Sequence, residues 1–226
     1  MLRLCVMLMA VLAFVLPAAR EASSEPAPTD LLFKARQMDM VGRGAAVTYK
    51  FERKVSDEKL LGAQFADDVR VGVLKVNEKG EREVTLNVFT GERAQETQNY
   101  PDLTINPIFL WYLDRTIKNL TGVAGGDGNY FKGRFRASFD DKGKAELIKT
   151  DFGGKQVTAY KVTIVPFLND PYAPRMRGYH KSNFEVVVSD EVPGYFLEMR
   201  MTIESPNKGS PRIEERLALV GLGEVK

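Results

Sequence analysis

Apolar and polar residues alternate along most of this chain, and alternation with a period of two is the pattern of β-strands that bury one face. Nine segments show it, at about 47–52, 69–73, 84–88, 130–139, 145–150, 156–165, 184–188, 195–203 and 213–219. Turn residues such as Asn77–Gly80 and Asp190–Gly194 join several of them through short connections. Short connections favour antiparallel neighbours, because parallel strands need a crossover of a dozen or more residues.

Most of these strands are apolar on one side only, so one face of the sheet is expected to be covered and the other to face water. A single antiparallel sheet of this size tends to curl, and its concave side must then be filled. We therefore predict a mainly β (α+β) fold. It consists of one curled antiparallel sheet or unclosed barrel of about nine strands, with two helices, one of which fills or lids the concave face.

Two segments have helical spacing instead. Asp30 is a good N-cap for a short helix over about 31–41, and Asn106-Pro107 predicts the start of a longer helix over about 107–121. The longer helix has one apolar stripe, formed by Phe109, Leu110, Leu113, Ile117 and Leu120. Ile108, Trp111 and Tyr112 fall outside this stripe, so its first two turns are apolar nearly all round. Either this helix fills or lids a cavity, or the segment Thr90–Ile105 covers its second face.

The N-terminus has the three parts of a secretory signal peptide. Arg3 precedes an apolar run of 13 residues, Leu4–Leu16, and the small residues Ala18 and Ala19 follow. The run is shorter than the ~20 residues of a membrane span. We predict a signal peptide over 1–24, a flexible spacer over 25–30 and a single β-rich domain over 31–226; an uncleaved N-terminal anchor is the alternative. The leader predicts export from the cytoplasm.

Composition narrows the chemistry. Removing residues 1–24 takes away two of the 32 basic and one of the 30 acidic residues, leaving a nearly balanced chain that does not resemble a nucleic-acid-binding protein. Cys5 is the only cysteine and lies in the leader, and His180 is the only histidine. Thiolate metal sites and cysteine nucleophiles are thereby excluded from the exported chain. With no nucleophile motif around a serine, we predict no catalytic residue, no metal, no cofactor and no enzymatic activity.

The segment 130–139 carries most of the candidate binding residues. As a strand it would place Phe131, Gly133 and Phe135 on one face, where large residues alternating with small ones leave space. The other face would present a row of cations that suits phosphate or carboxylate groups, or else a solvated outer surface. The predicted ligand-binding residues are Ile108, Phe109, Trp111, Tyr112, Phe131, Gly133 and Phe135. The predicted contacts to a head group or partner are Lys132, Arg134, Arg136, Arg175 and Arg177.

The order of these elements resembles the periplasmic lipoprotein-carrier (LolA/LolB-like) superfamily. The resemblance consists of a signal peptide, an N-terminal amphipathic helix, three strands, an apolar helix near Asn106–Leu120 and a run of antiparallel strands. It implies an unclosed barrel whose mouth is covered by helices and whose cavity holds acyl chains. It also implies that the exported protein is located in the periplasm. The resemblance is architectural, and no family motif matches position by position.

Two functions from different classes follow. The first is an exported envelope protein that binds an apolar or acylated ligand, as a lipid or lipoprotein carrier or sensor does. Its partners would be a lipid or an acylated protein, with peripheral membrane contact at most. The alternative is a non-enzymatic interaction or scaffold protein of the envelope with a packed core and an envelope protein as partner. Whether the interior of the curled sheet is empty or filled distinguishes the two.

Overall fold

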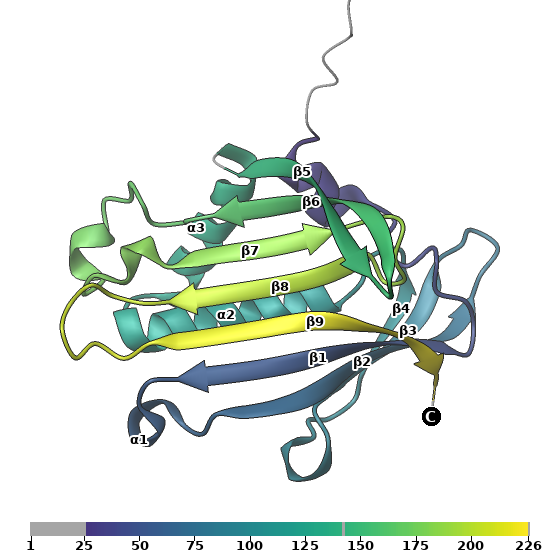
Figure 1. Ribbon diagram of the computed structural model, residues 1–226, viewed down its shortest axis with the longest axis horizontal. Helices are drawn as coiled ribbons and strands as arrows, with labels where there is room; N and C mark the ends of the chain where they lie inside the picture. Colours follow the sequence, from purple (N-terminus) through teal and green to yellow (C-terminus); the bar gives the residue numbers. More distant parts are fainter. Residues whose placement is uncertain (1–25, 142, 226) are drawn as a thin grey trace, which may run out of the picture.

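Nine antiparallel strands form one sheet that is not closed into a barrel (Figure 1). The computed structural model describes residues 26–141 and 143–225, so the predicted signal peptide lies outside the described residues. The spatial order is β4-β3-β2-β1-β9-β8-β7-β6-β5, which places the C-terminal strand at the centre beside β1. The strands are β1 (Ala45–Val55), β2 (Phe65–Val76), β3 (Arg82–Val88), β4 (Gln98–Leu103), β5 (Lys144–Phe152), β6 (Lys155–Ile164), β7 (Asn183–Val188), β8 (Phe196–Ile203) and β9 (Ile213–Glu224).

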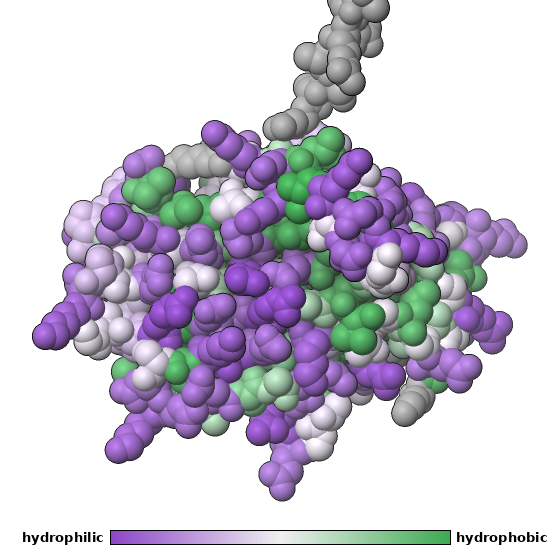
Figure 2. Space-filling model, viewed as in Figure 1, coloured by the Kyte–Doolittle hydropathy of each residue, from purple (hydrophilic) through white to green (hydrophobic). Residues whose placement is uncertain are grey.

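The alternation of side chains decides which face of each strand is buried. In β1, Val47, Tyr49 and Phe51 are buried, whereas Lys50 between them is exposed. Figure 2 shows that the sheet face turned toward the viewer is largely hydrophilic. Ion pairs cross neighbouring strands on this face, such as Lys161 with Glu185 at 2.8 Å. The predicted fold class is confirmed: one face is covered and the other is polar.

The two long helices lie on the covered face, behind the sheet in Figure 1. The longest are α2 (Ile108–Ala124) and α3 (Gly128–Asp141), and a short π-helical turn, η1 (Asp30–Lys34), precedes β1. The remaining helical elements are α1 (Glu58–Leu61), η2 (Gly91–Arg93), η3 (Ala173–Arg175) and η4 (Tyr179–Lys181). Helix α2 confirms the element predicted over 107–121, whereas the helix predicted over 31–41 is shorter and ends at Lys34.

The segment 130–139, predicted as a strand, is helical in α3, and this prediction is wrong. Phe131, Phe135 and Phe139 are spaced by four residues, which returns a side chain to the same face in a strand and almost to the same face in a helix. All three are buried, at 0%, 0% and 1% exposure. Helix α3 continues through Asp141. The ninth strand is β4, which the alternation did not indicate.

Aromatic side chains fill the space between the helices and the sheet. Phe109 of α2 stacks on Phe196 of β8 with ring centroids 5.4 Å apart and an interplanar angle of 8°. Phe135 of α3 meets Phe184 of β7 edge to face at 6.1 Å, and Phe131 meets Phe167 at 4.5 Å. Such edge-to-face and offset contacts add to the gain from burial. The concave side of the sheet is thus packed.

A buried polar joint fastens the N-terminal segment to this core. Asn106 is 0% exposed, its Nδ2 donates to the Tyr49 hydroxyl at 2.9 Å and to the Gly194 carbonyl at 2.8 Å, and its backbone N–H donates to Gln37 Oε1 at 2.8 Å. Its Oδ1 accepts the N–H of Ile108 at 3.1 Å, which caps α2. This joint fixes the segment around η1 relative to α2, and so positions the cleft described next.

Candidate functional site

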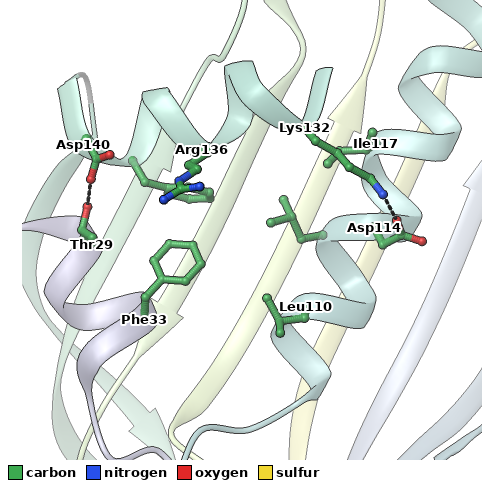
Figure 3. A pocket seen from close by; sticks show the side chains of 10 residues that line it. Thr29, Phe33, Leu110, Asp114, Ile117, Lys132, Arg136 and Asp140 are labelled. Carbon is green, nitrogen blue, oxygen red and sulfur yellow. Dashed lines mark hydrogen bonds and ion pairs between the residues drawn. The ribbon is translucent and has the colours of Figure 1, made fainter. Parts of the chain in front are cut away.

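A cleft opens between η1, α2 and α3, on the side of α2 that turns away from the sheet (Figure 3). Its volume is about 650 Å³, within the range of small-molecule binding sites. We call it the apolar cleft. It is lined by Thr29, Phe33, Leu110, Leu113, Asp114, Ile117, Lys132, Arg136, Phe139 and Asp140.

Apolar side chains from three elements form the walls of the apolar cleft. Leu110 on α2 is 47% exposed and Phe33 on η1 is 36% exposed, and the two side chains point into the space from opposite sides (Figure 3). Phe33 packs edge to face on Phe109 and on Phe139, each at 5.4 Å, so the cleft is a continuation of the aromatic core. A large apolar side chain that remains half-exposed in a concave site is available to an apolar ligand.

Charged side chains surround the mouth of the apolar cleft. Lys132 donates to Asp114 at 3.2 Å, and Lys118 donates to the same carboxylate at 2.8 Å. These hydrogen bonds, that of Lys118 first, hold the pKa of Asp114 below its ordinary value. Arg136 lies over the cleft in Figure 3 and forms no ion pair among the described residues. The rim therefore offers two cations, one of which has no carboxylate partner in the described part of the chain.

The predicted ligand-binding residues lie elsewhere. Ile108, Phe109, Tyr112, Phe131 and Phe135 are at most 2% exposed and belong to the packed core. Their placement around an open cavity is wrong, because facing aromatic side chains fill the space between sheet and helices.

The two remaining predicted ligand residues also lie outside the apolar cleft. Trp111 is half-buried against Phe51 and Phe89, and it lines a neighbouring groove of about 510 Å³ beside β4. This groove shares Leu110 and Asp114 with the apolar cleft. This arrangement agrees in part with the expectation that the segment 90–105 covers a second face of the helix. Gly133 lies on the exposed side of α3, where a Cβ would have no atom within 4 Å. It therefore leaves no space inside the fold.

The five predicted cations separate into three groups. Lys132 and Arg136 lie at the rim of the apolar cleft. Arg134 turns away from it and pairs with Asp170, which also accepts a hydrogen bond from the Tyr130 hydroxyl at 2.7 Å. The Asp170 carboxylate thereby attaches the loop after β6 to α3. Arg175 lies over the ring of Tyr172 at 6.0 Å, and Arg177 lines a different cleft. The sequence pattern therefore indicated both cations at the rim of the apolar cleft, Lys132 and Arg136.

The residues that line the apolar cleft were assigned to other roles by the sequence pattern. Leu110, Leu113 and Ile117 were placed on the buried stripe of the helix, but the face of α2 that packs on the sheet is rotated toward Ile108 and Tyr112. Phe33 and Thr29 lie far away in the chain and gave no signal. An Asp127 cap on α3, whose carboxylate accepts the N–H of Tyr130 at 2.9 Å, was the available sign that 128–141 is a helix.

One buried charged cluster lies beside α2, away from the apolar cleft. Glu215 on β9 is 1% exposed. Its carboxylate accepts hydrogen bonds from Arg53 and from Arg115, the latter through Nε at 2.9 Å and Nη2 at 2.8 Å. The Arg115 guanidinium also lies over the ring of Phe51, 4.8 Å from its centroid. Because two arginines share one carboxylate, the cluster has a net positive charge. We assign these buried ion pairs a structural role.

Among residues 26–141 and 143–225, no group of three or more histidine, cysteine, aspartate or glutamate side chains could hold a metal ion. None of the helices described there is both long and apolar enough to cross a membrane.

Comparison with known proteins gives structural neighbours only. No protein-family model and no curated protein matches the chain. The complex of MucA and MucB from Pseudomonas aeruginosa aligns over 88% of this chain and 57% of the matched chain, with 13% identity and a TM-score of 0.41. A structure of MucB in complex with MucA(peri) covers 88% and 55%, with 13% identity and a TM-score of 0.39. This chain therefore spans less than two thirds of the MucB chain.

A third structure is similar over a larger share of its own length. Lipoprotein LppX of Mycobacterium tuberculosis aligns over 83% of this chain and 93% of its own, with 15% identity and a TM-score of 0.30. These similarities concern the order and arrangement of elements, and no residue role is carried over from them. The predicted resemblance to the lipoprotein-carrier superfamily is one of architecture: an unclosed antiparallel sheet with helices on one face.

Proposed function

We propose that this chain is an exported binding protein that holds an apolar or acylated ligand in the apolar cleft. The observation that carries the proposal is the contrast in exposure along α2: Phe109 and Tyr112 are fully buried, whereas Leu110 between them is 47% exposed and faces a space of about 650 Å³. Covering Leu110 and Phe33 with an acyl chain would remove apolar surface from water, at about 0.8 kcal/mol for each buried CH₂.

The rim carries two cations, Lys132 and Arg136, and two carboxylates, Asp114 and Asp140. Asp114 already pairs with Lys132, so we propose Arg136 as the main contact to an anionic head group. Lys132 and Arg136 lie on one side of the mouth, on successive turns of α3. An arginine fork binds carboxylate or phosphate in a bidentate manner, and a nearby lysine adds a point charge. A fatty acid or an acidic lipid thus fits both the walls and the rim. We propose residues 1–24 as the signal peptide that brings the protein to the envelope, where such ligands occur.

The test begins with native mass spectrometry of the protein purified from its own host, with extraction of co-purifying lipid. A bound lipid or acylated peptide at defined stoichiometry is expected. Uptake of a fluorescent fatty-acid probe by the Leu110→Glu variant should fall at least tenfold, because a carboxylate then occupies the apolar wall. Leu147→Glu is the matched control, since Leu147 is similarly exposed at 56% but lies on β5 and does not line the cleft.

The packed interior favours a second candidate, an envelope interaction or scaffold protein without a lipid ligand. Its specific support is that Phe109, Phe131 and Phe135 leave no open cavity beneath the helices. A clean apo mass together with no uptake of the probe by the wild-type protein would contradict the lipid-binding proposal. The exposed Leu110 and Phe33 would then be part of a protein contact surface.

A further inference from the structure

A second cleft lies near the C-terminal end of α2, where α1 and the turn at 177–179 approach this helix. Its volume is about 430 Å³, and we call it the Arg177 cleft. Its polar lining consists of Arg53, Lys118, Asn119, Arg177, Tyr179 and Ser210. None of these residues lines the apolar cleft, so the two sites can be tested separately.

Positive charge predominates around the Arg177 cleft. Arg53, Lys118 and Arg177 line it, and no aspartate or glutamate does. The buried carboxylate of Glu215 is shared between Arg53 and Arg115, so it does not fully neutralise the charge of Arg53. Asp114 forms an ion pair with Lys118 at 2.8 Å and a second one with Lys132 at 3.2 Å. The elements around the cleft thus leave a surplus of cations.

Asn119 supplies an unused hydrogen-bond donor at this cleft. Its Oδ1 accepts from Arg53 Nη1 at 3.3 Å, which fixes the orientation of the amide. Its Nδ2 is buried and has no hydrogen-bond partner among the described residues. A buried donor without a partner costs about 1–3 kcal/mol, and most such groups in native proteins are satisfied by protein, water or ligand. A water molecule or a ligand oxygen would satisfy this donor.

The backbone of the 177–179 turn is held rigidly beside the cleft. Arg177 has a left-handed φ of 51°, and its carbonyl accepts hydrogen bonds from Ser205 Oγ at 2.8 Å and Asn207 Nδ2 at 3.0 Å. At Gly178 a Cβ would lie 2.3 Å from the Ser205 hydroxyl, so only glycine fits. A non-glycine residue in this conformation persists only when its surroundings determine it. The attachment point of the Arg177 side chain is therefore fixed.

We propose that the Arg177 cleft binds an oxyanion, the carboxylate or phosphate group of a ligand distinct from the one in the apolar cleft. Asn119 Nδ2 and the guanidinium of Arg177 would donate to its oxygens, and Lys118 would add charge. Tyr179 donates its hydroxyl hydrogen to the Pro211 carbonyl at 2.8 Å and forms part of the wall. Charge-assisted hydrogen bonds of this kind are stronger than those between neutral groups.

The experiment is an NMR titration of the purified protein with inorganic phosphate and, separately, with acetate, at constant ionic strength. Saturable shifts are expected at the Asn119 side-chain amide and at the Gly178 backbone N–H. The Arg177→Gln variant should weaken binding of the anion by about fivefold or more, and Asn119→Asp should abolish it because a carboxylate replaces the donor. Arg175→Gln is the control, since Arg175 lies two residues away and does not line the cleft.

Comparison of the two anions identifies the source of the oxyanion. Saturation by phosphate alone supports a phosphate ligand, and saturation by both supports any oxyanion of this size. Shifts that do not saturate, or equal weakening by Arg177→Gln and Arg175→Gln, would overturn the proposal. A circular dichroism spectrum confirms that each variant is folded, and fatty-acid uptake measured on the same samples shows whether the apolar cleft is unaffected.

Discussion

Apolar residues are buried on one side of helix α2 and partly exposed on the other. Toward the sheet, Phe109 and Tyr112 are completely enclosed by aromatic neighbours. Toward η1 and α3, Leu110 and Leu113 line an open cleft of about 650 Å³. The first side supplies the stability of the fold, and the second has apolar surface that the fold leaves uncovered. The difference teaches that an apolar helix surface can belong to the core on one side and to a binding site on the other.

The largest expected effect tests the packed side. Replacing Phe135 with alanine removes a fully buried ring from contacts with Phe167 and Phe184. We expect the free energy of unfolding to fall by about 3–5 kcal/mol, because a cavity remains. Urea denaturation followed by circular dichroism measures it. Leu110→Ala on the open side is the comparison, and a loss as large as that of Phe135→Ala would contradict the distinction.

The next effect concerns a charge on the packed side. Glu215→Gln leaves Arg53 and Arg115 beside each other without the carboxylate that they share. Breaking a buried ion pair is strongly destabilising, so we expect a loss of about 3 kcal/mol in the free energy of unfolding. Thermal denaturation of the wild type and the variant at equal ionic strength measures the difference. An unchanged midpoint would show that the cluster does not contribute to stability.

A smaller loss is expected at the joint that fixes η1 to the core. Asn106→Ala removes the cap of α2 and leaves the Tyr49 hydroxyl without the Nδ2 donor. We expect a decrease of about 2 kcal/mol in the free energy of unfolding. Hydrogen exchange should also accelerate in the first turn of α2, since the Ile108 N–H loses its acceptor, Asn106 Oδ1. Exchange that increases equally throughout the sheet would indicate a global effect instead.

On the open side, the expected change in stability is smaller still. Leu110→Ala should alter the free energy of unfolding by less than about 1 kcal/mol, since half of the side chain already contacts water. Uptake of a fluorescent fatty-acid probe should nevertheless decrease several-fold. Equilibrium titration of the probe measures this effect, and unchanged affinity would contradict the assignment of the cleft.

The smallest effect is a pH dependence at the rim of the apolar cleft. The pKa of Asp114 is lowered in the folded protein by Lys118 and Lys132. Its stabilising contribution is therefore present above the unfolded pKa of about 3.9 and is lost as pH falls through the lower folded value. Asp114 is 38% exposed, so the contribution should be below about 1 kcal/mol. Asp114→Asn should differ from the wild type at pH 7, and the difference should vanish near pH 2.

The sequence predicts the strands of this protein better than its cleft. Alternation locates eight of the nine strands because most of them bury one face. It misassigns 130–139 because phenylalanines spaced by four residues satisfy both periods. The cleft is harder still, since Phe33 and Leu110 come from segments that meet only in the folded chain. The rotation of α2 about its axis decides whether Leu110 or Tyr112 is buried. It depends on distant partners such as Glu215, 103 positions from Tyr112.

The central position of β9 has a consequence for how the chain reaches this structure. β9 lies between β1 and β8, and its pairing with β1 joins residues such as Phe51 and Leu217. During synthesis from the N-terminus, these two strands are separated by nearly the whole domain, so the sheet cannot be completed until the last strand is available. Contacts between distant segments slow folding. Until then β1 and β8 have open edges, which can pair with other chains. A C-terminal truncation would leave these edges permanently unpaired.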